Sequence, residues 1–225
     1  MIKIKRQHYR YLSLLTLTAA LSACGNNERV APHIYEVTLM NITQGQIFSP
    51  PALTTHAQDI TLWQAGKTAS VALEKLAESG DTSQLIALKG IEQSHVSTTP
   101  VMPGDKYTWT LEIDSEASQN ISLATMLINT NDGFTGDSGI DLSKLTRGER
   151  YQKMLVVYDA GTEMNDEVAI PGAGKEGFNA SRSGDVDRVY AHSGVLTSHE
   201  LTSSLLNAEH KFDNPAGKLI IKRVQ

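Results

Sequence analysis

Hydrophobic and polar residues alternate with a period of two along residues 35–40 and again along residues 106–114. Alternation of this kind predicts strands that bury one face. Residues 121–128 and 154–157 are apolar on both alternating sets, which is typical of strands covered on both faces, as at the centre of a sandwich. Two further strand candidates near the C-terminus are residues 186–190 and 219–224.

One segment has the period of an α-helix. Between residues 68 and 79, apolar residues recur every three or four positions and Gly80 follows them, so an amphipathic helix is expected to end there. Asp81 and Gln84 have the spacing of a capping box, which predicts a second short helix that ends near Gly90. The apolar set of the first helix is Ala69, Ala72, Leu73, Leu76 and Ala77.

These elements together predict a mainly β fold. Residues 44–51 contain Gly45 and the Pro50-Pro51 pair, so we expect a loop there. Several strands, turn-rich connections and one short helical insertion over about residues 68–90 indicate an antiparallel β-sandwich. The 225 residues suit one globular domain, and neither an internal repeat nor a low-complexity segment is visible.

The first 23 residues differ from the rest of the chain. They begin with four cations and no acid, and the apolar run at 11–20 is too short to span ~30 Å of hydrocarbon at ~1.5 Å per residue. This order predicts a secretory signal peptide. Residues 21–24 (Leu-Ser-Ala-Cys) resemble the bacterial lipobox, in which a peptidase cuts just before a cysteine that receives a diacylglyceryl group. The cations are Lys3, Lys5, Arg6 and Arg10.

Residues 1–23 are therefore expected to be a lipoprotein signal peptide, 24–32 a lipidated tether and 33–225 the folded domain. Each acyl chain would contribute roughly 0.8 kcal/mol per buried methylene, so lipidation of Cys24 would anchor a domain that has no spanning helix. Gly25 follows the cysteine instead of Asp, which resembles Gram-negative lipoproteins sent to the outer membrane. The expected location is the cell envelope, at the outer membrane, facing the periplasm or the surface. The alternative for Cys24 is a free thiol in a disordered leader.

Charge and cysteine content exclude several kinds of protein. The chain has 20 Lys and Arg against 25 Asp and Glu, a formal charge of −5 that argues against nucleic-acid binding. A single cysteine excludes a disulfide framework within the chain and a Cys-based zinc ribbon. Loss of residues 1–23 removes four cations and no acids, so 202 residues with a charge of −9 remain. Such acidity is compatible with calcium binding, although it usually serves solubility.

Two acidic loops are expected at the ends of the two most buried strands, at residues 129–139 and 158–163. Calcium prefers about 6–8 oxygen ligands from carboxylates, carbonyls and water. Asp132, Asp159 and Glu163 could supply three carboxylates, and neighbouring glycines would let backbone carbonyls approach. The alternative is that these acids and glycines are ordinary turn residues.

Four stretches resemble the spondin N-terminal domain as it occurs in bacterial proteins: residues 35–41, 48–51, 123–136 and 158–163. The most specific is the motif Asp-Ala-Gly-Thr-acid, which begins 27 residues after Asp132. In animals the family includes extracellular matrix proteins of the F-spondin and mindin type. Their domain is a β-sandwich related to C2 domains that binds one calcium ion and mediates adhesion.

The resemblance implies a C2-like β-sandwich in which Asp132, Asp159 and Glu163 are the calcium carboxylates. Glu163 departs from the animal pattern, which has Asp, and the disulfides of the animal domains have no counterpart here. The function expected is a calcium-binding adhesion or interaction module outside the cytoplasm, anchored by lipidated Cys24, and not an enzyme. Its partner would be an envelope or extracellular protein or glycan. The partner stays unidentified, because membership of a family does not show which molecule a given member binds. Membrane contact would come through the lipid.

A hydrolase that uses Ser138 is the alternative function. Residues 136–139 (Gly-Asp-Ser-Gly) match the string around the nucleophile of trypsin-like proteases, and such a serine needs a histidine base within reach. His56 lacks the usual setting of that base, and no His-x-x-x-His pair suggests a zinc site. His192 lies in a stretch that resembles a His-rich part of bacterial spondin-type domains, but a hydrogen-bonded loop histidine is favoured.

The two tryptophans differ in setting. Trp109 stands on the apolar set of its strand and is expected in the core. Trp63 is either a core residue or an exposed aromatic anchor for a sugar or protein, since the pattern around it favours neither.

Overall fold

The computed structural model describes residues 31–184 and 186–225. The predicted signal peptide, Cys24 and most of the predicted tether lie outside these residues. In the described part, no helix combines the length and the apolar character needed to cross a bilayer.

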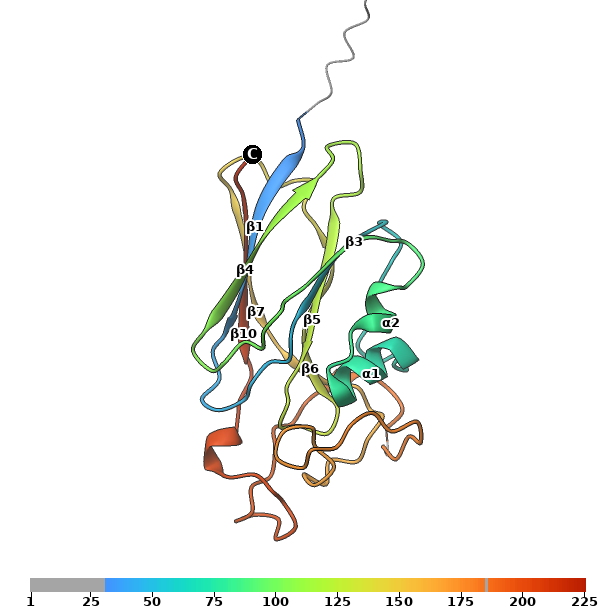
Figure 1. Cartoon of the computed structure of the whole chain (residues 1–225), viewed down its shortest axis with the longest axis vertical. Helices are drawn as coiled ribbons and strands as arrows, with labels where there is room; N and C mark the ends of the chain where they lie inside the picture. The colour runs from blue at the N-terminus through green and yellow to red at the C-terminus, as the bar shows by residue number, and fades with distance from the viewer. Residues whose placement is uncertain (1–30, 185) are drawn as a thin grey trace, which may run out of the picture. The chain divides into compact units, whose positions relative to one another are not determined.

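Two antiparallel sheets face each other and confirm the predicted β-sandwich (Figure 1). One sheet has four strands in the order β4-β1-β10-β7, and the other has six in the order β3-β2-β5-β6-β8-β9. The strands are β1 (His33–Asn41), β2 (Ala52–His56), β3 (Ile91–Val96), β4 (Lys106–Ile113), β5 (Asn120–Met126), β6 (Gly133–Asp141), β7 (Arg150–Leu155), β8 (Val157–Asp159), β9 (Tyr190–Ala191) and β10 (Gly217–Arg223).

The four-stranded sheet follows the alternation read from the sequence. β1 pairs with β4, and Val37 lies opposite Trp109. Both side chains are buried in the core between the sheets, so Trp109 is a core residue as predicted. β10 confirms the predicted C-terminal strand and lies between β1 and β7. The last residues of the chain therefore complete this sheet.

The six-stranded sheet is covered on both faces in its middle. All seven residues of β5 are buried, as predicted for a central strand. Ile121 and Leu123 face the core between the sheets, whereas Ala124 belongs to a second apolar cluster under the helical insertion. This second cluster contains Trp63, which meets Phe134 edge to face with 5.3 Å between ring centroids. Trp63 is therefore a core residue and not an exposed anchor.

The first predicted helix is confirmed as α1 (Val71–Ser79). Ser70 caps its start by accepting a hydrogen bond from the Leu73 N–H, and Gly80 ends it in the left-handed conformation. The second helix, α2 (Ser83–Ile86), is shorter than predicted and has no side-chain cap. Asp81 accepts a hydrogen bond from the Ser83 N–H at 2.9 Å instead, so it makes a local turn and not a capping box.

Two of the strand predictions were wrong. Residues 154–157 form no single buried strand: β7 and β8 belong to different sheets, and Leu155 and Val157 are buried whereas Met154 and Val156 are exposed. Most of 186–190 is irregular, because Val189 exchanges backbone hydrogen bonds with the loop at 66–67.

The first acidic loop is also shorter than expected. Residues 133–141 form β6, so only 129–132 remain as the turn after β5. Strands β2 and β3 were not predicted at all. Residues 44–51 are irregular as expected, with isolated bridges from Phe48 to Val101 and Leu127.

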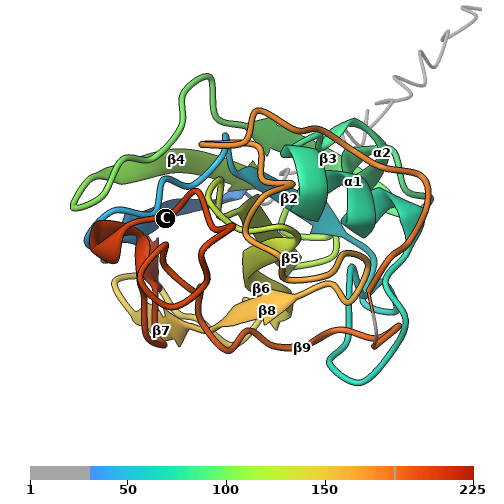
Figure 2. The same cartoon turned by 90° about the horizontal axis from the view of Figure 1, so that it is seen from below.

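The long loops gather at one end of the sandwich. In Figure 1 the start of β1 and the C-terminus lie at the top, whereas the loops that follow β8 and β9 lie below the sheets. Figure 2 looks onto this loop end, where these two segments cross the edge of β6 and β8. Both predicted acidic loops open at this end.

Candidate functional site

The sheet brings the two acidic loops together because β6 and β8 are neighbours. Gly133 pairs with Asp159 in their antiparallel register, so Asp132 and Asp159 come from adjacent strands. The carbonyl oxygen of Asp132 also accepts a hydrogen bond from the Ala160 N–H at 3.1 Å. Two carboxylates that are 27 positions apart in sequence therefore share one site, where β6 begins and β8 ends.

Asp132 is fully buried, and its two carboxylate oxygens differ. Oδ2 accepts hydrogen bonds from the Thr162 N–H (2.7 Å), the Thr162 hydroxyl (3.1 Å) and the Glu163 N–H (3.0 Å). Oδ1 is buried without a hydrogen-bond partner among the described residues. Burial, and after it the charge of Asp159, raises the pKa of Asp132 to about 7.

Asp159 is also fully buried, and both of its oxygens are engaged. Oδ1 accepts from the Gly161 N–H at 2.8 Å, and Oδ2 accepts from Asn165 Nδ2 at 2.9 Å. Gly161 has a φ of 74°, and a Cβ built on it would clash with the carbonyl oxygens of Val186 and Arg188. The Asp-Ala-Gly-Thr-Glu turn therefore needs glycine at this position.

Glu163 is nearly buried, with 7% of its surface exposed. Its pKa is raised to about 8. Burial is the largest cause, and the charges of Glu78 and Asp132 also raise this pKa. Glu78 comes from α1 and was missed from the sequence. Its Oε2 accepts from the Asn179 N–H at 3.0 Å, and its Oε1 is buried without a partner in the described part of the chain. The sequence held one sign of Glu78: it stands four residues after Glu74, beside the apolar stripe of the helix.

The three predicted ligands thus lie in one buried acidic cluster, which we define as Glu78, Asp132, Asp159 and Glu163. The charge of Asp159 raises the pKa of Asp132, and the charges of Glu78 and Asp132 raise that of Glu163. Buried carboxylates of this kind suit a hard cation, and the free Oδ1 of Asp132 is an oxygen such an ion could use. However, within residues 31–184 and 186–225 no three His, Cys, Asp or Glu side chains already converge as metal ligands. Carboxylate oxygens are ligands that calcium prefers, but N–H and O–H groups of the protein already donate hydrogen bonds to several of these oxygens.

A cavity of about 280 Å³ reaches this acidic cluster from the loop side. Glu163, Asn165 and Tyr190 line it. Burial, and after it the contact with Asp159, raises the pKa of the Tyr190 hydroxyl. The cavity gives a small ligand a route to Glu163.

His192 is a buried loop histidine, 4% exposed. Its Nδ1 accepts from the Gly194 N–H at 3.0 Å, and its ring packs on Phe212 with 5.3 Å between centroids. Nε2 has no partner among the described residues. Burial lowers the pKa of His192, whereas the charge of Asp159 acts against this.

Ser138 lies in β6, and its hydroxyl is held by the scaffold. Its Oγ accepts from the Leu62 N–H at 2.9 Å and lies 3.5 Å from the Ser122 hydroxyl. Ser122, and not Ser138, is the serine that contacts His56, at 2.8 Å. In the described part of the chain, no histidine hydrogen-bonds to Ser138, so the geometry required for a serine nucleophile is not formed.

Comparison with known proteins identifies a family for the chain. The family model described as Spondin_N matches residues 42–174, which include Asp132, Asp159 and Glu163. The match begins after β1, so residues 35–41, one of the stretches that carried the resemblance, lie outside it. No curated protein matches the chain. A family match over more than half of the sequence shows that the chain belongs to the Spondin_N family.

Proposed function

We propose that this protein is a calcium-binding interaction module of the cell envelope, anchored outside the cytoplasm by lipid on Cys24. Spondin_N is a family of non-catalytic interaction domains, and membership fits an extracellular interaction module that is not an enzyme. The observation that carries the calcium proposal is the free, buried Oδ1 of Asp132 beside two further buried carboxylates.

The electrostatics of the acidic cluster favour a bound cation. Glu78, Asp132 and Glu163 all have raised pKa values, and burial is the first cause for each. Asp132, Asp159 and Glu163 would hold the ion, and calcium would supply the positive charge that these buried groups lack. An ion that binds only the folded state would also stabilise it by mass action.

The placement of the chain's described start supports the anchoring proposal. β1 begins at the end of the sandwich opposite the acidic loops (Figure 1). A domain tethered through the residues before β1 would therefore turn the acidic cluster away from its attachment point. That end is then available to a partner.

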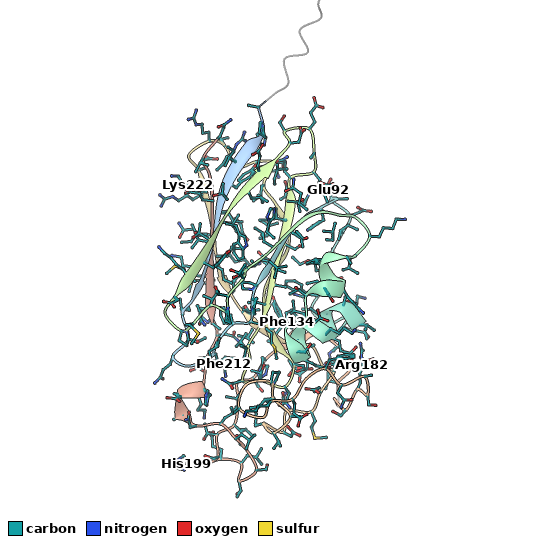
Figure 3. All side chains as sticks on the ribbon, viewed as in Figure 1. Glu92, Phe134, Arg182, His199, Phe212 and Lys222 are labelled. Carbon is teal, nitrogen blue, oxygen red and sulfur yellow. The ribbon has the colours of Figure 1, made fainter. Side chains whose placement is uncertain are left out.

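Calorimetric titration of the chain that begins at residue 25 with Ca²⁺ tests the proposal. We expect binding together with a rise in Tm, and Asp159→Asn should abolish both. Glu92→Gln is the matched control, because Glu92 is exposed on β3, away from the loop end (Figure 3). Absence of binding and of any thermal shift at millimolar calcium would contradict the metal proposal. Unchanged binding by Asp159→Asn would contradict the residue assignment.

A further inference from the structure

A second cavity, of about 330 Å³, lies beside the acidic cluster. Two side-chain oxygens of residues that line it are buried without a hydrogen-bond partner among the described residues: Glu167 Oε2 and Asn165 Oδ1. Glu167 is only 1% exposed. A buried carboxylate oxygen with no donor is unfavourable, so its presence beside a cavity indicates a ligand that donates hydrogen bonds.

The rest of Glu167 is held in place by the protein. Its backbone N–H donates to Asn131 Oδ1 at 3.2 Å, its carbonyl accepts from the Leu205 N–H at 3.1 Å, and its Oε1 accepts from the Leu196 N–H at 3.0 Å. Its φ of 58° lies in the left-handed region, which is rare for a residue with a side chain. Strained residues that are held in this way occur often at binding sites.

The cavity lining favours an organic cation over a metal ion. Both free atoms are hydrogen-bond acceptors, and one of them belongs to a carboxylate, so the complementary group is a charged donor. Phe212 and Val195 form apolar parts of the lining that suit an aliphatic stem. A metal ion would need more oxygen ligands than these two.

Among the described residues that line the cavity, Lys211 is the one cation and Asp213 is a second acid. Lys211 donates to Glu200 at 2.6 Å, and both of these side chains are exposed, so it does not pair with Glu167. Burial raises the pKa of Glu167, and a cationic ligand would supply the charge that stabilises its ionised form.

Exposed apolar residues lie next to Glu167, and one of them, Leu196, lines the cavity. Val168, Leu196 and Leu205 are 39%, 45% and 49% exposed. Leu196 and Leu205 are the residues whose N–H groups bond to Glu167, and Val168 follows it in the chain. A charged pocket with exposed aliphatic side chains close to it is typical of an anchor site at a protein interface. Figure 3 places Phe212 at the loop end of the sandwich, where a partner would approach.

We propose that this cavity receives a lysine or arginine side chain of a partner protein, whose charged group donates to Glu167 Oε2 and Asn165 Oδ1 while Leu196 and Leu205 pack around it. The inference rests on the proposed role as an interaction module and names the chemistry of the partner. It does not depend on calcium. Asn165 joins the two sites, because its Nδ2 donates to Asp159.

NMR titration of the chain that begins at residue 25 tests this inference. The probes are the Nα-acetyl N-methylamides of lysine, arginine and, as the neutral control, norleucine. We expect the two cationic probes to bind with a Kd of about a millimolar and to shift the amide signals of residues 165–167, 194–196 and 212. Equal shifts with norleucine, or no shifts with the cationic probes, would overturn the inference.

Variants separate a charge effect from a loss of structure. Glu167→Gln should weaken cationic binding at least tenfold, whereas Glu209→Gln, at an exposed position of η1 (Ala208–His210), should not change it. Ser193→Trp changes an exposed residue of the lining and should block the cavity while Glu167 stays intact. The inference is wrong if Glu167→Gln and Ser193→Trp both keep a native amide spectrum and both bind the cationic probes as tightly as the unmodified chain does.

Each titration is repeated with calcium and with chelator, so that the two proposals fail separately. Probe binding in chelator, together with no calcium binding, would support this inference and contradict the metal proposal alone. Calcium binding without probe binding would contradict this inference alone.

Discussion

The two carboxylate oxygens of Asp132 lie in different surroundings, and this difference underlies the proposed site. Oδ2 accepts three hydrogen bonds from the Asp159–Glu163 turn, whereas Oδ1 accepts none from the described residues. The bonds orient the side chain, but burial and the neighbouring charge still raise its pKa. We therefore expect Asp132 to respond to both pH and cations.

The metal-free protein should lose stability as pH rises. Asp132 and Glu163 have folded-state pKa values of about 7 and about 8, so between pH 6.5 and 8.5 they hold protons that the unfolded chain has already released. Extra protons on the folded state mean that stability is lost as pH rises through these values. We expect a decrease of about 3 kcal/mol across this range in chelator, measured by urea denaturation. Stability that rises or stays constant would contradict these pKa shifts.

Two glycines separate a steric effect from a conformational one. Gly161→Ala should destabilise the protein by about 2 kcal/mol, because the turn needs a positive φ and has no room for Cβ. Gly139→Ala is the control: its φ is 76°, but no atom lies within 4 Å of the added Cβ. It should cost about 1 kcal/mol, from conformation alone. Equal losses in thermal or urea unfolding would show that the contact with 186–188 does not matter.

At the level of elements, an ion pair fastens the loop after β8 to α1. Arg182 donates from Nε and Nη2 to the two oxygens of Glu74, at 3.1 and 2.8 Å, and Nη2 also donates to the Ala69 carbonyl. Glu74 is 3% exposed. The helical insertion therefore holds this loop, whose Asn179 N–H also donates to Glu78 of the acidic cluster. Figure 3 shows Arg182 beside the helical insertion.

Arg182→Ala should cost about 2 to 3 kcal/mol in unfolding free energy, because it leaves the Glu74 carboxylate buried without its partner. Lys211→Ala removes an exposed ion pair and is the control, for which we expect little change in the urea midpoint. Similar midpoints for the two variants would show that the loop does not depend on Arg182.

At the level of the whole molecule, the proposed sites lie at one end of the sandwich and the described start of the chain at the other (Figure 1). Cys24 is expected to carry the lipid, so Cys24→Ser should remove the diacylglyceryl mass that mass spectrometry finds on the unmodified chain. Calcium binding should be unchanged. A lipid mass that persists in this variant would contradict lipidation at Cys24.

The sequence predicted correctly those strands and that helix in which one face is apolar and buried and the other is polar. Val37 and Trp109 stand on alternating apolar sets, and α1 carries its stripe between a capping Ser70 and Gly80. β2 was missed because its Thr54, Thr55 and His56 are polar but buried. The partner of His56, Ser122, comes from a strand 66 positions later in sequence, so no local pattern shows that its burial is satisfied.

The sequence by itself predicted the β-sandwich and the position of α1, and it singled out Asp132, Asp159 and Glu163 as candidate ligands, because periodicity and short motifs are local properties. The tertiary structure alone decided that Glu78 joins the acidic cluster, that Ser138 has no histidine partner among the described residues, and that Glu167 faces a cavity. Each of these depends on which strands are neighbours and on which loops cross the same end. Burial and charge interaction are properties of that arrangement, and the order of residues does not contain them.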